Sequence, residues 1–249
     1  WSPTELSGKP GESTIRKHLR SAYQPVPSGS RPTRPTLAEA HRGVIRRVNV
    51  PAGIKVVALT FDLCEQPYEI SVYQGDIVDY LRSERIPATF YASGKWLLTH
   101  PTRAEQLLAE PLYEMGNHAW EHRNFHVLET ARMATEIVGA QHAFAMVHRR
   151  LTARGCFRTS PNSKTVAATP VPRNFRFPFG ACRADAIKAG NDEGLRIIQW
   201  DISSADPWRG QTVKGMVTAV VDRVRPGSIV LFHANGRGWK TGAALPINI

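Results

Sequence analysis

The 249-residue sequence lacks several features that define common protein classes. It has no apolar run near the roughly 18 residues that a membrane-spanning helix needs, so we expect no membrane span. It also has no glycine-rich phosphate-binding loop, no GxSxG motif of the kind that carries a nucleophilic serine, and no internal repeat. Nucleotide-phosphate chemistry, a serine nucleophile on such a turn and a repeat architecture therefore receive no support from the sequence.

The first 50 residues carry much of the excess positive charge. The whole chain has a net charge of +11, and residues 1–50 hold nine Lys or Arg against three Glu. They are rich in Pro, Ser and Gly, as in QPVPSGSRPTRPT, and they lack sustained hydrophobic periodicity. We interpret residues 1–50 as a basic leader, either a solvated tail or a segment that holds an anionic polymer, and residues 51–249 as the main domain. No nucleic-acid-binding motif accompanies the charge, so we expect no nucleic-acid partner.

Beyond the leader, stretches typical of strands alternate with stretches typical of helices. The predicted strands cover residues 55–62, 86–93, 113–120, 174–180, 196–203 and 227–234. The predicted helices cover residues 71–85, 101–110, 128–151, 183–195 and 211–224. This alternation indicates βαβ units and a parallel sheet, and about six such units favour closure into a barrel.

Polar side chains suited to catalysis lie at or just beyond the ends of five predicted strands: Asp62, His118, Arg176, Asp206 and His233. In a parallel barrel the carboxyl ends of the strands converge on one face, where catalytic residues from several strands meet. His118 and His122 are four residues apart, a spacing that can bring two imidazoles to one Zn²⁺. We therefore expect one active site on that face.

Five ordered motifs resemble those of the polysaccharide deacetylases, carbohydrate esterase family 4, which includes chitin, peptidoglycan and acetylxylan deacetylases. They are TFD at 60–62, HAWEH at 118–122, RFPFG at 176–180, SSADPW at 203–208 and LFH at 231–233. The resemblance spans about residues 56–239. It implies a distorted (β/α)₇ barrel of the α/β class and a metal-dependent hydrolase that removes N- or O-acetyl groups from a glycan. It also implies one divalent ion, with Zn²⁺ favoured, and a secreted or periplasmic location.

The resemblance further implies a role for each matching residue. Asp62 matches the catalytic base, Arg176 the arginine that orients the base, His233 the general acid and Asp206 the acid that tunes that histidine. The backbone N–H of Phe179 matches an oxyanion donor, Trp208 and Leu231 match apolar walls around the acetyl methyl group, and His118 and His122 match two metal ligands.

The first motif departs from the family pattern at the third metal ligand. The family usually has two consecutive aspartates, whereas here Asp62 is followed by Leu63, which cannot bind a metal. Glu65 is a candidate replacement, since carboxylate oxygens bind Zn²⁺, and Asp62 could itself turn to the metal. The other interpretation of Glu65 is a carboxylate that caps a turn.

Three cysteines complete the set of candidate residues. Cys64 and Cys182 fall on loops expected on the same face of the barrel, so they could form a disulfide, which fits an oxidising compartment. The alternatives are two separate buried thiols, or Cys64 as a thiolate metal ligand. Cys156 takes no part in any of these alternatives.

Two other functions remain open at this stage. One is a hydrolase of a non-sugar C–N bond on the same barrel. Loss of the second aspartate permits such an enzyme to act without a metal. The other is a non-catalytic carbohydrate-binding relative, against which the catalytic-type side chains argue.

The sequence continues for only 16 residues beyond His233, where the family usually adds a closing helix and strand. Either the sequence is cut short or the barrel is incompletely closed, and we expect an unpaired seam between the first and last predicted strands. Exposed apolar residues are expected to line that seam.

Overall fold

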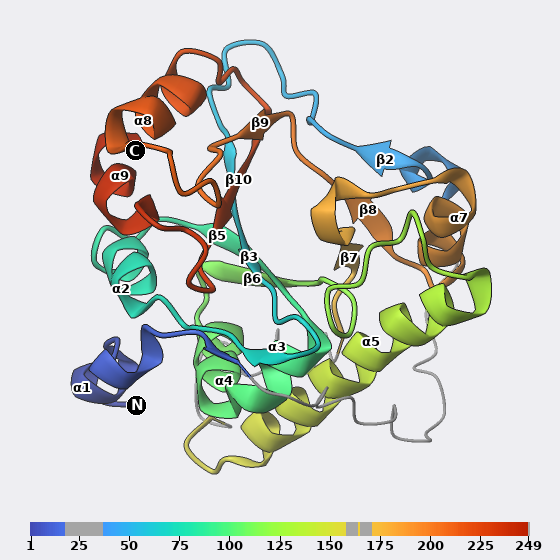
Figure 1. Ribbon diagram of the computed structural model, residues 1–249, viewed down its shortest axis with the longest axis horizontal. Helices are drawn as coiled ribbons and strands as arrows, with labels where there is room; N and C mark the ends of the chain where they lie inside the picture. The colour runs from blue at the N-terminus through green and yellow to red at the C-terminus, as the bar shows by residue number, and fades with distance from the viewer. Residues whose placement is uncertain (18–36, 158–163, 165–170, 249) are drawn as a thin grey trace.

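Eight short strands form one sheet in which every pair of neighbouring strands runs parallel (Figure 1). The computed structural model describes residues 1–17, 37–157, 164 and 171–248. The strands are β2 (Val44–Ile45), β3 (Ala58–Leu63), β5 (Ala88–Ala92), β6 (Tyr113–Asn117), β7 (Asn174–Phe175), β8 (Arg196–Ile198), β9 (Ile202–Ser203) and β10 (Ile229–His233), in the order β2-β8-β7-β6-β5-β3-β10-β9. The predicted α/β fold is confirmed, as a curled parallel sheet surrounded by helices.

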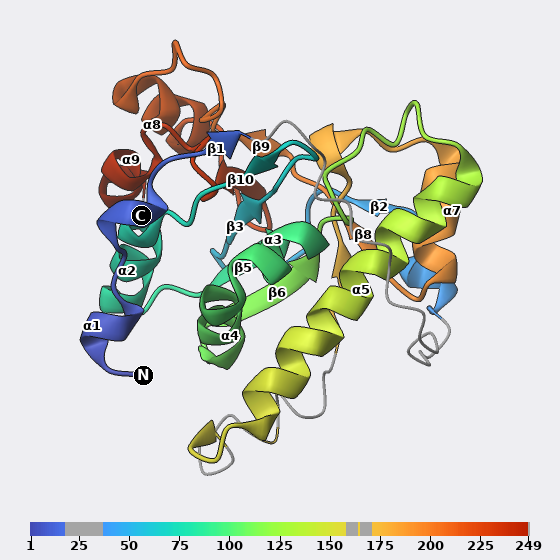
Figure 2. The ribbon, with the colours of Figure 1, turned by 60° about the horizontal axis from the view of Figure 1, so that its bottom comes forward.

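The longer helices cover the outside of the curled sheet (Figures 1 and 2). They are α2 (Gly75–Ser83), α3 (Gly94–Thr99), α4 (Pro101–Ala109), α5 (Thr130–Ala153), α7 (Ala184–Asp192), α8 (Val213–Val221) and α9 (Thr241–Asn248). The helix α5 packs against α3, α4 and α7, and α9, which follows β10, packs against α8 and α2. None of the helices in the described part of the chain is long and apolar enough to cross a membrane.

The core lies between the central strands and the helices. The ring of Phe61 on β3 stacks against Phe90 on β5 and against Phe232 on β10, with 5.4 Å between ring centroids in each pair. All three side chains are fully buried. Because side chains alternate along a strand, burying Phe61 and Leu63 on the core side turns Asp62 to the opposite side, away from the apolar core.

The last strand pairs directly with the first strand of the predicted domain, so the predicted position of the seam is wrong. β10 pairs with β3 over five residues, from Ile229 opposite Ala58 to His233 opposite Asp62. The physical reason is the apolar packing between these strands. Exposed apolar side chains lie instead on the segment that joins β2 to β3: Val48, Ile54, Val56 and Val57.

The gap in the barrel lies beside β9. The predicted strand 196–203 is divided into β8 and β9, which stand near opposite ends of the strand order although only residues 199–201 separate them. The cause is the segment 44–48, which pairs with β8 through β2 and bridges Ser228 through Arg47. The curled sheet therefore stays open, as predicted, but at a different place.

Parts of the basic leader contact the main domain. β1 (Arg16–Lys17) pairs antiparallel with β4 (Glu69–Ile70), and the short helix α1 (Pro3–Leu6) precedes it. The guanidinium of Arg103 on α4 donates to the Glu12 carboxylate at 2.7 Å and to the carbonyl oxygens of residues 5–7. Residues 18–36 of the leader lie outside the described residues, whereas residues 44–45 of the leader form β2 of the main sheet. The division at residue 50 stays a prediction.

Candidate active site

The predicted site residues gather at the carboxyl ends of neighbouring strands. Asp62 and His233 lie opposite each other at the ends of β3 and β10. His118 follows β6 directly and Arg176 follows β7 directly. This arrangement follows from the parallel sheet, in which the carboxyl ends of the strands share one edge.

Asp62 is held in place by a buried arginine. Arg176 Nη1 donates to Asp62 Oδ1 at 2.9 Å and to Thr60 Oγ1 at 2.8 Å. The Arg176 guanidinium also stacks over the ring of Tyr91, 4.1 Å from its centroid. These contacts, together with complete burial of Arg176, fix both the position and the orientation of the Asp62 carboxylate.

His118 contacts the same carboxylate from the other side. Its Nδ1 lies 2.9 Å from the carbonyl oxygen of Arg176, and its Nε2 lies 3.3 Å from Asp62 Oδ2. Burial favours a raised pKa for Asp62, but the neighbouring His118 and Arg176 outweigh burial and hold that pKa below its usual value. Asp62 is therefore a carboxylate at neutral pH and can accept a proton.

His233 and Asp206 form a second buried pair. His233 Nδ1 lies 2.9 Å from Asp206 Oδ1, while Asp206 Oδ2 accepts hydrogen bonds from the His233 backbone N–H at 2.6 Å and from Thr241 Oγ1 at 2.7 Å. Burial alone would lower the pKa of His233, but the Asp206 carboxylate raises it above its usual value. The imidazole is thus suited to carry and donate a proton.

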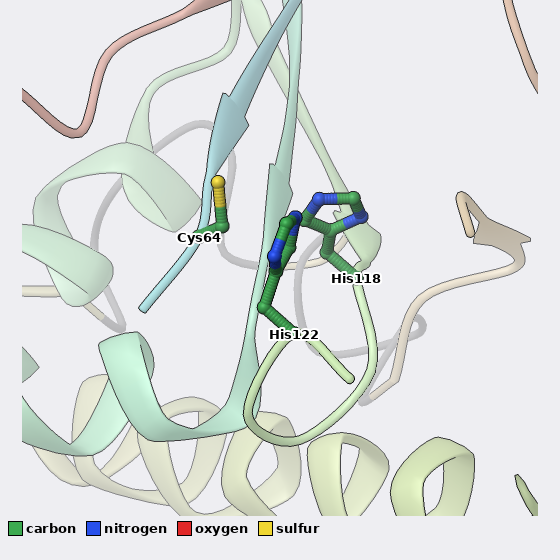
Figure 3. A group of neighbouring side chains, drawn as sticks. All are labelled: Cys64, His118 and His122. Atoms are coloured by element: carbon green, nitrogen blue, oxygen red, sulfur yellow. The ribbon is translucent and has the colours of Figure 1, made fainter. Parts of the chain in front are cut away.

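Three potential metal-binding side chains meet beside Asp62: Cys64, His118 and His122 (Figure 3). One ligand-type atom of each lies within 4.8 Å of the others, and all three residues are buried. His122 Nδ1 has no hydrogen-bond partner among the described residues, and His118 Nε2 makes no hydrogen bond there beyond its 3.3 Å ionic contact with Asp62, although a buried polar atom normally has a partner. Unpartnered imidazole nitrogens next to a thiol fit a divalent metal such as Zn²⁺.

The structure brings Cys64, rather than Glu65, to the histidine pair. Glu65 Oε2 accepts hydrogen bonds from the backbone N–H of Ser71 at 3.0 Å and from Thr99 Oγ1 at 2.8 Å. Its carboxylate also lies 3.8 Å from Lys95 Nζ. Glu65 therefore ties down the loop after β3, as the alternative of a turn-capping carboxylate expects, and its role as a metal ligand stays an untested prediction.

Of the alternatives for Cys64 and Cys182, the structure does not bear out the bridge, because both are free thiols. Cys64 Sγ faces the two histidines and lies 2.9 Å from Asn235 Nδ2. Cys182 lies next to the guanidinium of Arg46, with 4.0 Å between Sγ and Nη2. The two sulfurs are thus held by different neighbours.

The residues expected to contact substrate differ in exposure. Phe179 and Trp208 are exposed, whereas Leu231 is buried on β10. Phe179 lies in the short helix η4 (Pro178–Gly180), and its ring packs edge-on against His122 with 4.4 Å between centroids. The oxyanion and apolar-wall roles of these three residues stay predictions.

Four residues around the site have left-handed backbone conformations, which are costly for residues other than glycine. They are Ala119, His122, Phe179 and Ala205, with φ between 57° and 64°. Such strain, typically about 1–3 kcal/mol per residue, tends to occur where a functional geometry requires it. Here it accompanies the turns that carry His118, His122 and Asp206.

Several residues that contact the site residues had no role assigned to them from the motifs. Thr60, Tyr91 and Thr241 contact Arg176 or Asp206, and Asn235 contacts Cys64. Asn235 lies two residues beyond His233, so its place at a strand end was the available signal. Thr241 had no such signal, because a turn of the chain brings it to Asp206.

Comparisons with known proteins agree with this geometry. The family model described as polysaccharide deacetylase matches residues 49–198. A chitooligosaccharide deacetylase from Bradyrhizobium sp. (strain ANU 289) is 27% identical over 182 residues, which cover 73% of this chain and 72% of that protein. A peptidoglycan-N-acetylglucosamine deacetylase from Bacillus cereus is 26% identical over 189 residues, which cover 75% of this chain and 76% of the relative.

Solved structures share the fold. A family 4 carbohydrate esterase from Streptomyces lividans in complex with acetate has a TM-score of 0.59 and 24% identity, over 78% of this chain and 85% of the esterase. A CE4 family pseudoenzyme from Bacillus anthracis has a TM-score of 0.62 and 21% identity, over 82% of this chain and 61% of the pseudoenzyme. The chain thus spans less than two thirds of the pseudoenzyme's length. The matched motifs, the open parallel barrel and the family model together place this chain in the polysaccharide deacetylase family.

Proposed function

We propose that this chain is a metal-dependent hydrolase that removes acetyl groups from a glycan, either a polymer that contains N-acetylglucosamine or an acetylated xylan. One observation carries the proposal: the ionised Asp62 carboxylate and the proton-carrying His233 imidazole lie opposite each other at the ends of the neighbouring strands β3 and β10. Asp62 has its pKa lowered and His233 has its pKa raised, as a base and an acid require. The names of the two curated deacetylase relatives support the substrate class.

The chain's own residues supply the proton transfers. Asp62 accepts a proton from the attacking water, and Arg176 keeps Asp62 ionised and aligned. His233 then donates a proton to the departing amine or alkoxide, while Asp206 orients its ring. The backbone N–H of Phe179 is proposed to stabilise the oxyanion of the acyl group.

His118 and His122 would hold the divalent ion, for which Zn²⁺ is the favoured candidate. When bound, such an ion polarises the acetyl carbonyl and lowers the pKa of water. Trp208 and Leu231 are proposed to enclose the acetyl methyl group. We further propose that the protein acts outside the cytoplasm, as the name of the peptidoglycan-acting relative suggests.

Acetate release tests the proposed activity. The Zn²⁺-loaded protein should release acetate from at least one of three substrates: chitin oligosaccharides, peptidoglycan or acetylated xylan. An Asp62→Asn variant serves as the background, and the fold of each protein is checked by circular dichroism. If the folded protein released no more acetate than the variant from all three substrates, the activity would be refuted and a non-catalytic relative would be favoured.

The pH profile of the activity should report the pairing of His233 with Asp206. Activity requires protonated His233, so it should fall as the pH rises through the His233 pKa, which Asp206 keeps above its usual value. Replacing Asp206 with Asn removes the negative charge, so the His233 pKa should fall and the alkaline limb should move to lower pH. The check is kcat measured across pH for both proteins. An alkaline limb that stays in place would contradict the assignment of His233 as the acid.

A further inference from the structure

The position that carries the family's metal-binding aspartate is not available to a metal in this chain. Leu63 occupies it, is completely buried and belongs to the hydrophobic core. Because side chains alternate along an extended strand, Leu63 faces the core while Asp62 and Cys64 face the opposite side. The next residue on the side of the site is therefore Cys64.

Cys64 lies beside His118 and His122, where a third protein ligand of the metal is expected. Its sulfur and one nitrogen each of His118 and His122 are within 4.8 Å of one another (Figure 3). In Figure 3 the Cys64 side chain, at the end of β3, stands beside the imidazoles of the loop that follows β6. Both histidines are more than nine-tenths buried. His122 Nδ1 has no hydrogen-bond partner among the described residues, and His118 Nε2 has only its 3.3 Å ionic contact with Asp62.

Burial and the nearby Asp62 carboxylate raise the pKa of the Cys64 thiol, so it is protonated without a metal, but the sulfur has a hydrogen-bond donor beside it. Asn235 Nδ2 donates to the Cys64 carbonyl oxygen at 2.8 Å and lies 2.9 Å from Cys64 Sγ. An amide N–H aimed at a sulfur orients a ligand and stabilises its negative charge, as outer-shell hydrogen bonds do at metal sites. Asn235, in the segment that follows β10, thereby fixes the position of Cys64.

We propose that Cys64 is the third protein ligand of the metal, so that one thiolate and two imidazoles hold the ion. This inference rests on the proposed metal dependence. On binding, the Cys64 thiol loses its proton to solvent and the sulfur donates an electron pair to the ion, with no change in oxidation state. Three such ligands leave a fourth position open for water or substrate, as in catalytic zinc sites.

A thiolate changes which ions the site prefers. Thiolate and imidazole ligands favour Zn²⁺ and Co²⁺, whereas Mg²⁺ and Mn²⁺ favour carboxylate and water oxygens. We therefore expect the chelator-treated protein to bind Zn²⁺ and Co²⁺ in preference to Mg²⁺ and Mn²⁺. This preference is a property of the resting protein and needs no turnover to be measured.

Two spectroscopic measurements test the ligand directly. The protein is stripped of metal with a chelator and reloaded with one equivalent of Co²⁺ or Zn²⁺. The Co²⁺ form should show a thiolate-to-cobalt charge-transfer band in the near ultraviolet, and X-ray absorption of the Zn²⁺ form should show one sulfur at about 2.3 Å. Cys64→Ser should abolish the band and weaken Zn²⁺ binding by more than about 100-fold, since losing a ligand should cost at least as much as losing an outer-shell partner.

Cys182→Ser is the matched control, because it removes a thiol that lies next to Arg46 and outside the cluster. It should keep both the charge-transfer band and the Zn²⁺ affinity. A wild-type protein that binds one ion through nitrogen and oxygen alone, or a band that survives in Cys64→Ser, would overturn the role of Cys64 while leaving metal dependence intact. A wild-type protein that binds neither ion would overturn the metal dependence and this inference with it.

Discussion

Replacing Asp62 with Asn is expected to lower kcat for acetyl release by about 10²–10⁴-fold, the usual contribution of a positioned general base. The amide keeps the shape of the carboxylate but cannot accept the proton of the attacking water. The side chain also stays near Arg176, so substrate binding should change much less than turnover. The measurement is kcat and KM on the glycan that releases most acetate, with the fold checked by circular dichroism.

Glu65→Gln is the matched control for this substitution. Glu65 is a buried carboxylate like Asp62, but it lies on the loop after β3 and accepts hydrogen bonds from Ser71 and Thr99. It should therefore retain turnover and metal content even if its stability falls. Turnover of Asp62→Asn within a few-fold of the wild-type value would remove Asp62 from the role of base, and metal loss in Glu65→Gln would restore Glu65 as a ligand.

Replacing His118 with Ala is expected to remove the metal and to lower kcat by orders of magnitude. His118 offers Nε2 to the cluster, and its Nδ1 is fixed by the carbonyl oxygen of Arg176. The metal per chain, measured by elemental analysis after gel filtration, should fall from about one to near zero when only two protein ligands remain. Activity should not return at Zn²⁺ concentrations that saturate the wild-type protein.

His126→Ala provides the comparison, because His126 is an exposed histidine on the same loop. It should keep one metal per chain and wild-type turnover. Unchanged metal content and activity in His118→Ala would show that the metal assignment is mistaken. Loss of activity with full retention of metal would instead give His118 a role in positioning Asp62, from which its Nε2 is 3.3 Å away.

Local patterns in the sequence were sufficient to predict the central strands β3, β5, β6 and β10. Asp62 and His233 each end an apolar run, and parallel pairing then brings them opposite each other without further information. The break at residues 199–201 could not be predicted in this way. It depends on the segment 44–48, which has no strong strand pattern of its own and is placed by contacts with distant parts of the chain.

The proposed third metal ligand illustrates a second limit of sequence reasoning. Glu65 and Cys64 are neighbours, and both are chemically suitable for binding a metal. Which of them faces the histidines depends on Ser71 and Thr99, whose hydrogen bonds draw Glu65 away, and on Asn235, which contacts Cys64. Such preferences arise from tertiary packing, so motif spacing alone could not distinguish the two residues.

The same fold occurs in a carbohydrate esterase and in a pseudoenzyme, so the fold by itself does not decide whether this chain is active. The decision rests on the chemistry of the site. The pairing of Asp62 with Arg176 and of His233 with Asp206 favours an active enzyme, whereas Leu63 marks the one position where the usual chemistry is lost. The experiments on Asp62 and Cys64 address these two features separately.

The pairing of β10 with β3 also has a consequence for how the chain folds during synthesis. It joins residues far apart in sequence, such as Thr60 and Val230, whose hydrogen bond spans 170 positions. Contacts of such long range slow folding, because a large loop must close before they form. One edge of β3 therefore stays unpaired until residues 229–233 have left the ribosome. During that interval the unpaired backbone groups of this apolar strand can pair with other chains. We therefore expect the emerging chain to need protection from aggregation that the folded barrel does not need.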